Sequence, residues 1–329
     1  MIRTTLAEQI AMDQARSQAT GELSLLLNRI TLAGRMIATE IMRAGLAGKL
    51  GLTGEVNVQG EEVKALDVIS NDIVLQVFEN IDVVKSLASE EMENAHDYSD
   101  HKAGKYVLMF DPLDGSGNID VDGSMGTIFS IHRRTDDSTG TVEDFFRRGS
   151  EQVAAGYILY GPATMFVYTT GSEVNGFTLD RSVGVFFLTH KNMRFPSGEG
   201  SYSVNEANQS KWNDATQKMV QRFREGETDC GKRSARYVGA LVADFHRTMI
   251  QGGIYMYPAD NKNANGKLRL LYEAAPLAMV AKAAGGTAST GEQDILDVVP
   301  EQLHQRVPLF IGATEDVDEA VRLLATGRA

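Results

Sequence analysis

The chain has 329 residues, of which 43% are hydrophobic and 23% are charged, and its formal net charge is −12 at pH 7. This composition is typical of a folded globular protein with one large domain or two ordinary ones, and it excludes a disordered chain. The negative charge argues against nucleic acid or an anionic membrane surface as a partner, because both would repel the protein.

Cysteine usage and the apolar runs indicate the compartment. Cys230 is the only cysteine, so an intrachain disulfide and a cysteine metal site are excluded. The segment from Met1 to Gln18 lacks the apolar core of a signal peptide, and no run of about 18 apolar residues predicts a membrane span. We therefore expect a cytoplasmic protein.

A long amphipathic helix is predicted from Thr20 to about Gly45, with Thr20 as N-cap and Glu22 in its first turn. The apolar positions recur at helical spacing: Leu23, Leu26, Leu27, Ile30, Ile37 and Ile41. Glycines between Gly48 and Gly60 predict a mobile connection. A second helix is predicted from about Lys64 to Asn80.

The remaining elements alternate between strands and helices. Apolar or alternating runs predict strands at 106–110, 127–132, 153–160, 165–169 and 185–189, and short strands near Ile254 and Leu309. Helical patterns occupy about 206–225, 237–250, 270–284 and 316–324. A Pro- and Gly-rich break at 195–200 predicts a boundary between a domain of residues 1–195 and one of residues 196–329. The sequence therefore predicts a layered α/β protein.

The segment from Phe110 to Asp120 follows the first of these strands and carries two carboxylates and a glycine-rich turn. A buried strand that ends in Asp111-Pro-Leu-Asp114 delivers two hard oxygen ligands to one point. The N–H groups of Gly115, Ser116 and Gly117 can form an anion-binding concavity beside them. The residues alone leave open an ordinary turn in which an Asp caps a helix.

Three further acids could either face solvent or bind a cation. Glu90 and Glu91 follow Ser89 at the end of a short apolar stretch, and Asp72 lies within the second predicted helix. Glu273 stands among apolar residues, so its charge needs a cation or a salt-bridge partner. Two divalent cations held by such acids can bind both the attacking water and the leaving oxygen in phosphate-ester hydrolysis.

Eight segments make the chain recognisable. They are 66–72 (LDVISND), 89–91 (SEE), 104–107 (GKYV), 111–116 (DPLDGS), 126–129 (GTIF), 235–239 (ARYVG), 243–247 (ADFHR) and 266–273 (GKLRLLYE). The sequence resembles the class I fructose-1,6-bisphosphatase family, within the superfamily of lithium-sensitive, magnesium-dependent sugar and inositol phosphatases. The resemblance runs from about Thr20 to Gly312. The DPLDGS segment marks only the superfamily, whereas the segments at 235 and 266 are much more specific to fructose bisphosphatases.

The resemblance implies a five-layer αβαβα fold, an N-terminal regulatory half and a C-terminal substrate half. It implies two to three Mg²⁺ per active site, with Mn²⁺ or Zn²⁺ as substitutes. The implied ligands are Glu90, Glu91, Asp111, Asp114, Glu273 and the carbonyl oxygen of Leu113. Asp72 and Glu91 would orient or deprotonate the attacking water.

The implied reaction is hydrolysis of fructose 1,6-bisphosphate to fructose 6-phosphate in gluconeogenesis, by a homotetramer. The implied substrate-binding residues are Asp114, Gly115, Ser116 and Arg269 at the 1-phosphate, Asn205, Tyr237 and Tyr257 at the 6-phosphate, Lys267 at the sugar, and Arg236 reaching into a neighbouring active site. Without the resemblance, the two tyrosines would be core aromatics and the two cations Lys267 and Arg269 a solvated strand edge. Two departures from the family pattern are Gly117, where a second serine is common, and Asn208, where a tyrosine often helps bind the 6-phosphate.

The resemblance also implies an AMP site that inhibits the enzyme. Its residues are Thr20, Gly21, Glu22, Lys105, Tyr106 and Arg133, beside free N–H groups at a predicted helix start. The alternative is that Thr20 is only a helix cap and that Lys105 and Arg133 only flank strands. Two alternatives for the function are sedoheptulose-1,7-bisphosphatase activity, alone or as a second activity, and a non-catalytic sugar-phosphate sensor.

Overall fold

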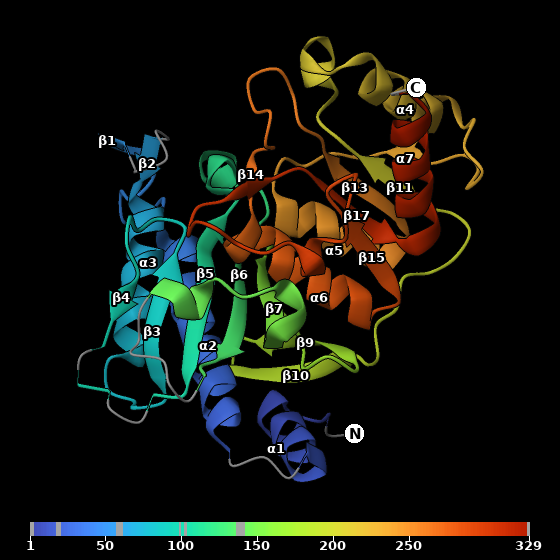
Figure 1. The fold of residues 1–329 in the computed structure, drawn as a ribbon. Coiled ribbons are helices and arrows are strands. Elements are labelled where there is room, and N and C mark those ends of the chain that lie inside the picture. Colours follow the sequence, from blue (N-terminus) through green and yellow to red (C-terminus); the bar gives the residue numbers. More distant parts are fainter. Residues whose placement is uncertain are drawn as a thin grey trace.

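The computed structural model describes residues 3–17, 21–56, 62–98, 100–101, 104–135 and 142–327. An eight-stranded sheet has the strand order β10-β9-β8-β7-β6-β5-β3-β4, and a five-stranded sheet has the order β12-β11-β13-β17-β15 (Figure 1). Two short pairs, β1-β2 and β14-β16, lie outside these sheets. The first large sheet uses residues up to His190, and the second begins at Ser201.

The elements of the first half are α1 (Leu6–Ser17), α2 (Glu22–Arg43), β1 (Leu52–Val56), β2 (Glu62–Lys64), α3 (Ala65–Phe78), β3 (Val84–Ser89), β4 (His96–Asp97), β5 (Tyr106–Asp114), η1 (Ser116–Val121), β6 (Met125–Arg133), η2 (Val142–Phe145), η3 (Gly149–Glu151), β7 (Gln152–Tyr160), β8 (Thr164–Thr169), β9 (Val174–Asp180) and β10 (Val185–His190). Those of the second half are β11 (Ser201–Ser203), η4 (Glu206–Lys211), α4 (Asp214–Glu225), β12 (Ser234–Ala235), α5 (Leu241–Gln251), β13 (Gly253–Tyr257), β14 (Leu268–Arg269), η5 (Leu270–Ala274), α6 (Ala275–Ala283), β15 (Gly286–Ser289), η6 (Ile295–Asp297), β16 (Arg306–Val307), β17 (Leu309–Ala313) and α7 (Thr314–Gly327).

The helices and sheets form five layers, which confirms the predicted αβαβα fold. Helices α2 and α3 cover one face of the eight-stranded sheet, and α5 and α6 lie between its other face and the five-stranded sheet. Helices α4 and α7 cover the outer face of the five-stranded sheet (Figure 1). Each layer buries an apolar face against the next.

Alternation along the central strands explains how one sheet packs on both sides. In β6, Phe129 and Ile131 belong to the core under α2 and α3, whereas Ile128 belongs to the core with α5 and α6. In β7, Ile158 likewise belongs to the core under α2 and α3, and Tyr157 belongs to the core with α5 and α6. Successive side chains of a strand point to opposite faces, so a strand buried on both faces reads as a continuous apolar run.

Three predicted helices differ from the observed ones at their first turns. Residues 206–211 form η4, and α4 begins afresh after Asn213, whose Oδ1 accepts the Thr216 N–H at 2.8 Å. The helix predicted from Tyr237 begins only at Leu241, because Gly239 is left-handed with φ 86° and Ala240 is extended. The helix predicted from Leu270 begins with the π-helical turn η5.

Other elements were not predicted from the sequence. The described part of the glycine-rich connection contains β1, which pairs antiparallel with β2, while residues 57–61 lie outside the described residues. Helix α1 and strand β9 lie in segments for which no element was predicted. Strand β9 forms because β8 and β10 flank it on both sides.

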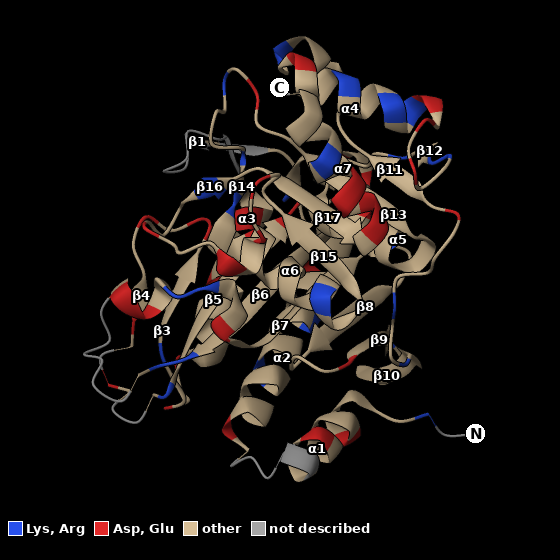
Figure 2. Ribbon diagram, turned by 45° about the vertical axis from the view of Figure 1, so that its right-hand side comes forward, with Lys and Arg blue, Asp and Glu red and all other residues tan. Residues whose placement is uncertain are grey.

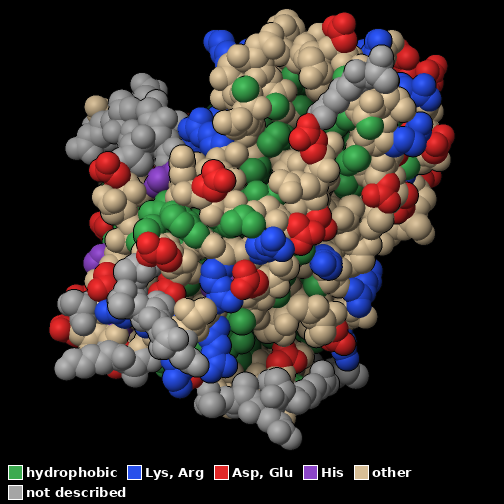
Figure 3. Space-filling model, in the orientation of Figure 1, with side chains coloured by type: hydrophobic (Ala, Val, Ile, Leu, Met, Phe, Trp, Pro, Cys, Tyr) green, Lys and Arg blue, Asp and Glu red, His purple; other side chains and the backbone are tan. Residues whose placement is uncertain are grey.

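The surface carries charges of both signs. Acidic and basic side chains are interspersed over the face drawn in Figure 3, and α4 concentrates basic residues, with Arg222 and Arg224 in its last turn (Figure 2). Within the described residues, every helix is too short or too polar to cross a membrane.

Candidate active site

Two neighbouring parallel strands deliver the first acids of the site. Strands β3 and β5 pair in parallel with Ser89 opposite Phe110, so Glu90 and Asp111 both emerge at the carboxyl ends of these strands. The Glu90 N–H donates to the Phe110 carbonyl at 3.1 Å, which fixes this register. Adjacent carboxyl ends of a sheet are where α/β proteins place their ligands.

The second half of the chain adds Glu273. It lies in the η5 turn, and its carboxylate accepts the N–H of Arg269 at 2.5 Å. Single π-helical turns occur most often at functional sites. Ligand oxygens of Glu90, Asp111 and Glu273 lie within 4.8 Å of one another, and all three residues are buried. This acid cluster joins both halves of the chain.

The acid cluster brings several carboxylates together around the buried Arg269. The Arg269 guanidinium lies 3.0 Å from Glu90 and is itself 4% exposed. Burial and the charge of Glu273 together raise the pKa of Glu90 to about 8, even though Arg269 opposes the shift. Burial and the charge of Glu90 likewise raise the pKa of Asp111 well above its usual value. A divalent cation would remove this repulsion, so the donor set fits a hard metal ion.

Asp114 ends β5 and connects the acid cluster to α5. Its two carboxylate oxygens accept the N–H groups of Leu241 at 3.3 Å and of Val242 at 2.6 Å. Burial raises the pKa of Asp114 to about 7, whereas these N–H groups oppose the shift. An acid at a helix N-terminus binds otherwise unpaired N–H groups and the positive end of the dipole.

The glycine-rich turn predicted to hold phosphate lies beside these acids. Gly115 is left-handed, with φ 79°, and a Cβ built on it would lie 2.4 Å from the Cβ of Ala240. Only glycine fits this position without strain. Ser116 opens η1, and its side chain lies near the carboxyl group of Asp67.

Asp67 is a buried acid to which the sequence analysis assigned no role. Burial raises its pKa to about 7, and the charge of Glu91 raises it too. Its carboxylate also accepts the Lys64 N–H at 3.0 Å, at the start of α3. Asp67 therefore links α3, Ser116 and the neighbourhood of Glu91. The sequence feature that could have identified Asp67 is its position as an acid within the apolar pattern of a predicted helix.

Asp72 is placed differently from the other predicted acids. It is exposed on α3 and lines a cavity of about 450 Å³ with Leu75, Tyr98 and Asp97 among others. None of the residues described as lining that cavity belongs to the acid cluster. Glu91, by contrast, is close enough for its charge to raise the pKa of both Glu90 and Asp111.

The residues predicted to hold the second phosphate come together from separate segments. The Tyr237 hydroxyl lies near the Asn205 side chain. Burial raises the pKa of Tyr237 to about 12, and the nearby Tyr257 and Asp244 raise it too. Asp244 is fully buried and accepts the N–H groups of Val238 and Gly239 at 2.9 to 3.1 Å, so it shapes the loop that presents Tyr237. The sequence analysis assigned no role to Asp244.

The predicted basic residues differ in exposure. Arg269 is buried in β14, Lys267 is half-buried one residue before β14, and Arg236 is exposed, with its guanidinium donating to its neighbour's carbonyl at Ala235. Asn208, which stands where a tyrosine often occurs, accepts a hydrogen bond from the Lys211 ammonium at 2.7 Å.

The residues predicted for AMP gather at the opposite end of β5. Gly21 precedes α2 with φ 93°, and the Glu22 carboxylate lies 2.7 Å from the Lys105 ammonium. Tyr106 pairs with Arg133 across β5 and β6. Thr20 lies outside the described residues.

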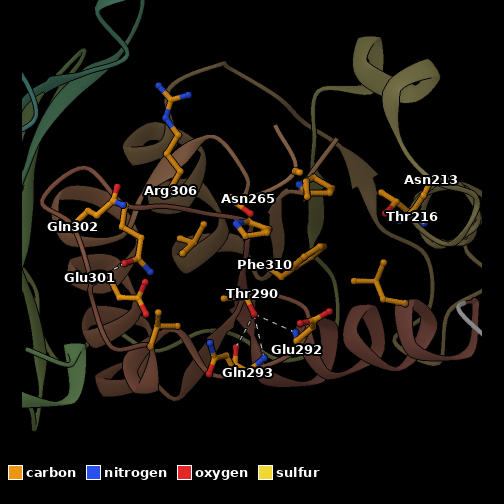
Figure 4. Close-up of a pocket in the computed structure, with 18 of the residues that line it drawn as sticks. Asn213, Thr216, Asn265, Thr290, Glu292, Gln293, Glu301, Gln302, Arg306 and Phe310 are labelled. Atoms are coloured by element: carbon orange, nitrogen blue, oxygen red, sulfur yellow. Dashed lines mark hydrogen bonds between the residues drawn. The ribbon is translucent and has the colours of Figure 1, made fainter. Parts of the chain in front are cut away.

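A cavity of about 650 Å³ lies apart from the acid cluster (Figure 4). Amide side chains of Asn265, Gln293 and Gln302 and the ring of Phe310 line it, together with Glu301 and the segment from His304 to Pro308. None of the cluster acids lines it. The chemistry of the site therefore follows the buried acids and not this hollow.

Comparisons with known proteins identify the family. Residues 4–191 match the profile "Fructose-1-6-bisphosphatase, N-terminal domain", and residues 195–325 match its C-terminal counterpart. The chain is 49% identical to the class 1 fructose-1,6-bisphosphatase of Persephonella marina over 315 residues, 95% of each chain. It is 50% identical to that of a Sulfurihydrogenibium species over 309 residues, 94% of each chain.

Solved structures agree with the sequence relatives. The holo form of Leishmania major fructose-1,6-bisphosphatase superposes with a TM-score of 0.92 at 39% identity, over 100% of this chain and 99% of that one. The apo form of the same enzyme superposes with a TM-score of 0.87 at 38% identity, over 99% of each chain. The chain belongs to the class 1 fructose-1,6-bisphosphatase family.

Proposed function

We propose that this protein hydrolyses fructose 1,6-bisphosphate to fructose 6-phosphate and phosphate, as a phosphoric monoester hydrolase of gluconeogenesis. The observation that carries the proposal is the buried acid cluster of Glu90, Asp111 and Glu273 at the end of β3 and β5, beside the left-handed turn at Gly115. Near-full-length relatives at about half identity bear this activity in their names.

The metal ion is proposed to be Mg²⁺, two or three per active site, with Mn²⁺ or Zn²⁺ as substitutes. Its ligands would be Glu90, Glu91, Asp111, Glu273 and Asp114, with the carbonyl oxygen of Leu113. When bound, these ions would supply charge neutralisation at the phosphate and activation of the attacking water. Because burial and mutual repulsion raise the carboxyl pKa values of Glu90 and Asp111, metal binding would release protons.

The protein's own groups would orient the substrate. The N–H groups of Gly115 and Ser116 would donate to the 1-phosphate, with Arg269 nearby. Asn205, Tyr237 and Tyr257 would hold the 6-phosphate, and Lys267 would reach the sugar. Arg236, exposed beside Tyr237, would reach a neighbouring active site in a homotetramer. Glu91 and Asp72 would orient the attacking water. Because Asp72 is exposed, Glu91 is the stronger candidate for this role.

The decisive measurement is phosphate release from a panel of sugar bisphosphates, with and without Mg²⁺. Fructose 1,6-bisphosphate should be hydrolysed only with the cation, and Glu273→Gln should lower kcat by about 10²-fold or more because it removes a ligand charge. Glu301→Gln is the control, since Glu301 is exposed at the separate cavity. Full activity in excess chelator would rule out the mechanism, and faster release from sedoheptulose 1,7-bisphosphate would reassign the substrate.

Regulation by AMP is proposed at the cluster of Gly21, Glu22, Lys105, Tyr106 and Arg133. The site would use the N–H groups at the start of α2 for the phosphate, and Lys105 would have to leave Glu22, 2.7 Å away, to join it. We also propose a cytoplasmic location, consistent with the single cysteine.

AMP titrations test this second site. Inhibition should be noncompetitive with substrate and weaker in Lys105→Ala, whereas Lys49→Ala should respond like the wild type, because Lys49 pairs with Glu40 at the other end of α2. The expected coupling is about 1 to 3 kcal/mol. Absence of inhibition at millimolar AMP, or purely competitive inhibition, rejects the site.

A further inference from the structure

Contacts within the turn and a backbone hydrogen bond to β5 place Glu90 and Glu91. The Glu91 N–H donates to the Ser89 hydroxyl at 3.3 Å, and the Met92 N–H donates to the Ser89 carbonyl at 3.3 Å. The carbonyl of Met92 points instead to a distant part of the chain. His304 Nε2 lies 2.9 Å from it.

This contact fixes the protonation of the imidazole. A carbonyl oxygen can only accept, so Nε2 of His304 carries the proton and donates to Met92. His304 lies 212 residues away in the sequence and belongs to the second half of the chain. The hydrogen bond therefore attaches the acid turn of the first half to the second half.

The segment around His304 is itself firmly placed. Leu303 packs against an apolar cluster that contains Met109 and Tyr272, and the rings of Tyr272 and His304 lie 5.4 Å apart. The next residue, Gln305, accepts the Leu270 N–H at 2.8 Å through its carbonyl. A donor on so well anchored a segment can determine where a turn lies.

The same segment also positions the other side of the acid cluster. Arg306 pairs with Arg269 between β16 and β14, and Leu270 begins the η5 turn that holds Glu273. One short piece of chain, residues 303–306, thus contacts the turn of Glu90 and Glu91 and the strand that leads to Glu273. Its contacts set the spacing between the acids of the two halves.

We infer that His304 is a positioning residue for the metal site, holding Glu90 and Glu91 at the correct distance from Asp111 and Glu273. The inference rests on the proposed metal-dependent function. A small hard cation such as Mg²⁺ demands near-ideal ligand geometry, so a displaced turn weakens binding. Groups that orient ligands without touching the ion typically change metal affinity about 10- to 100-fold when they are removed.

Calorimetric titration with Mg²⁺ in the absence of substrate tests this role. His304→Phe keeps a ring beside Tyr272 but removes the donor, and we expect a Kd for Mg²⁺ at least about 10-fold higher than in the wild type. His304→Gln places an amide nitrogen near the position of Nε2, and we expect it to restore Kd to within about threefold of the wild type. Gln302→Ala is the matched control, because Gln302 lies two residues away and lines the cavity of Figure 4, as His304 does, so this variant reports the effect of altering that cavity alone.

Each outcome decides between the alternatives. A wild-type Kd for Mg²⁺ in His304→Phe, or equally weakened Mg²⁺ binding in His304→Phe and His304→Gln, would show that the N–H donor of His304 does not position the metal site. If His304→Phe does not fold, His304→Asn replaces it, because its shorter amide cannot reach the Met92 carbonyl and its expected Kd is equally high. Wild-type protein that binds no Mg²⁺ would overturn the proposed function itself. Wild-type binding with an unaffected variant would overturn only the role of His304.

Discussion

At the scale of single residues, the site depends on carboxyl groups that are held away from water without enough positive charge beside them. Glu90, Asp111 and Glu273 are all less than a tenth exposed, and Arg269 is the basic side chain that contacts Glu90. Such a cluster stores repulsion in the metal-free protein. The stored repulsion should appear as a dependence of stability on pH.

We expect Glu90 to destabilise the metal-free protein as the pH rises. Burial raises its pKa from 4.5 to about 8. Below pH 4.5 the group is protonated in both the folded and the unfolded state, so its contribution to stability is fully present there; it is lost as the pH rises towards 8, where the unfolded chain has already released the proton.

Thermal unfolding in chelator, followed from pH 5 to pH 8, measures this effect. The Tm of the wild type should fall relative to that of Glu90→Gln as the pH rises, and added Mg²⁺ should restore the wild type more than the variant. Parallel Tm curves for the two proteins would contradict the assignment of the raised pKa to this residue.

At the scale of secondary-structure elements, the turn between β5 and η1 sets the geometry of the phosphate site. Gly115 is left-handed, and its Cα faces Ala240 at the start of α5 so closely that no side chain fits. Asp114, one residue earlier, accepts two N–H groups of the same helix. The turn and the helix N-terminus therefore form one unit, although they come from different halves of the chain.

Gly115→Ala should disturb this unit. The added Cβ would meet the Ala240 Cβ at 2.4 Å, in a backbone conformation that alanine rarely adopts. We expect a loss of about 1 to 3 kcal/mol in unfolding free energy and a lower kcat, because the phosphate donors would move. Gly117→Ala is the matched control, since a Cβ there meets nothing within 4 Å. Equal unfolding free energies for the two variants, measured by denaturant titration, would refute the argument.

At the scale of the whole molecule, the site is built where two halves of the chain meet. The parallel pair β3 and β5 supplies one group of acids, and the η5 turn and the α5 N-terminus supply the remaining contacts. Arg236 and Tyr237 follow the edge strand β12 of the second sheet, and Arg236 is exposed. This placement is consistent with a contribution to another subunit.

Arg236→Ala should raise KM for fructose 1,6-bisphosphate more than it lowers kcat, because its contact would lie far from the bond that breaks. Steady-state kinetics measure the two constants, and Arg224→Ala, another exposed arginine on the second half, serves as the control. A dissociated wild-type monomer that binds substrate as tightly as the oligomer would exclude a shared site.

Many of the helices, strands and site residues of this protein could be predicted from local sequence. The spacing of Leu26, Ile30 and Ile37 predicted α2, and the apolar run ending in Asp111 predicted β5 and the acids after it, because period and turn chemistry are properties of neighbouring residues. The family motifs then identified the other acids one by one. The late start of α5 was missed, because the Asp244 carboxylate accepts backbone N–H groups of the preceding loop, a contact that no periodicity encodes.

Tertiary structure alone decided which of these residues meet. Glu90 and Asp111 lie together because β3 pairs with β5, and Glu273 reaches them from the second half of the chain. The same holds for the hydrogen bond between His304 and Met92. A sequence pattern records the local preference of each segment, whereas proximity between distant segments follows from strand order and layer packing. The sequence by itself therefore determined the chemistry of the side chains, and the fold determined their distances, burial and pKa values.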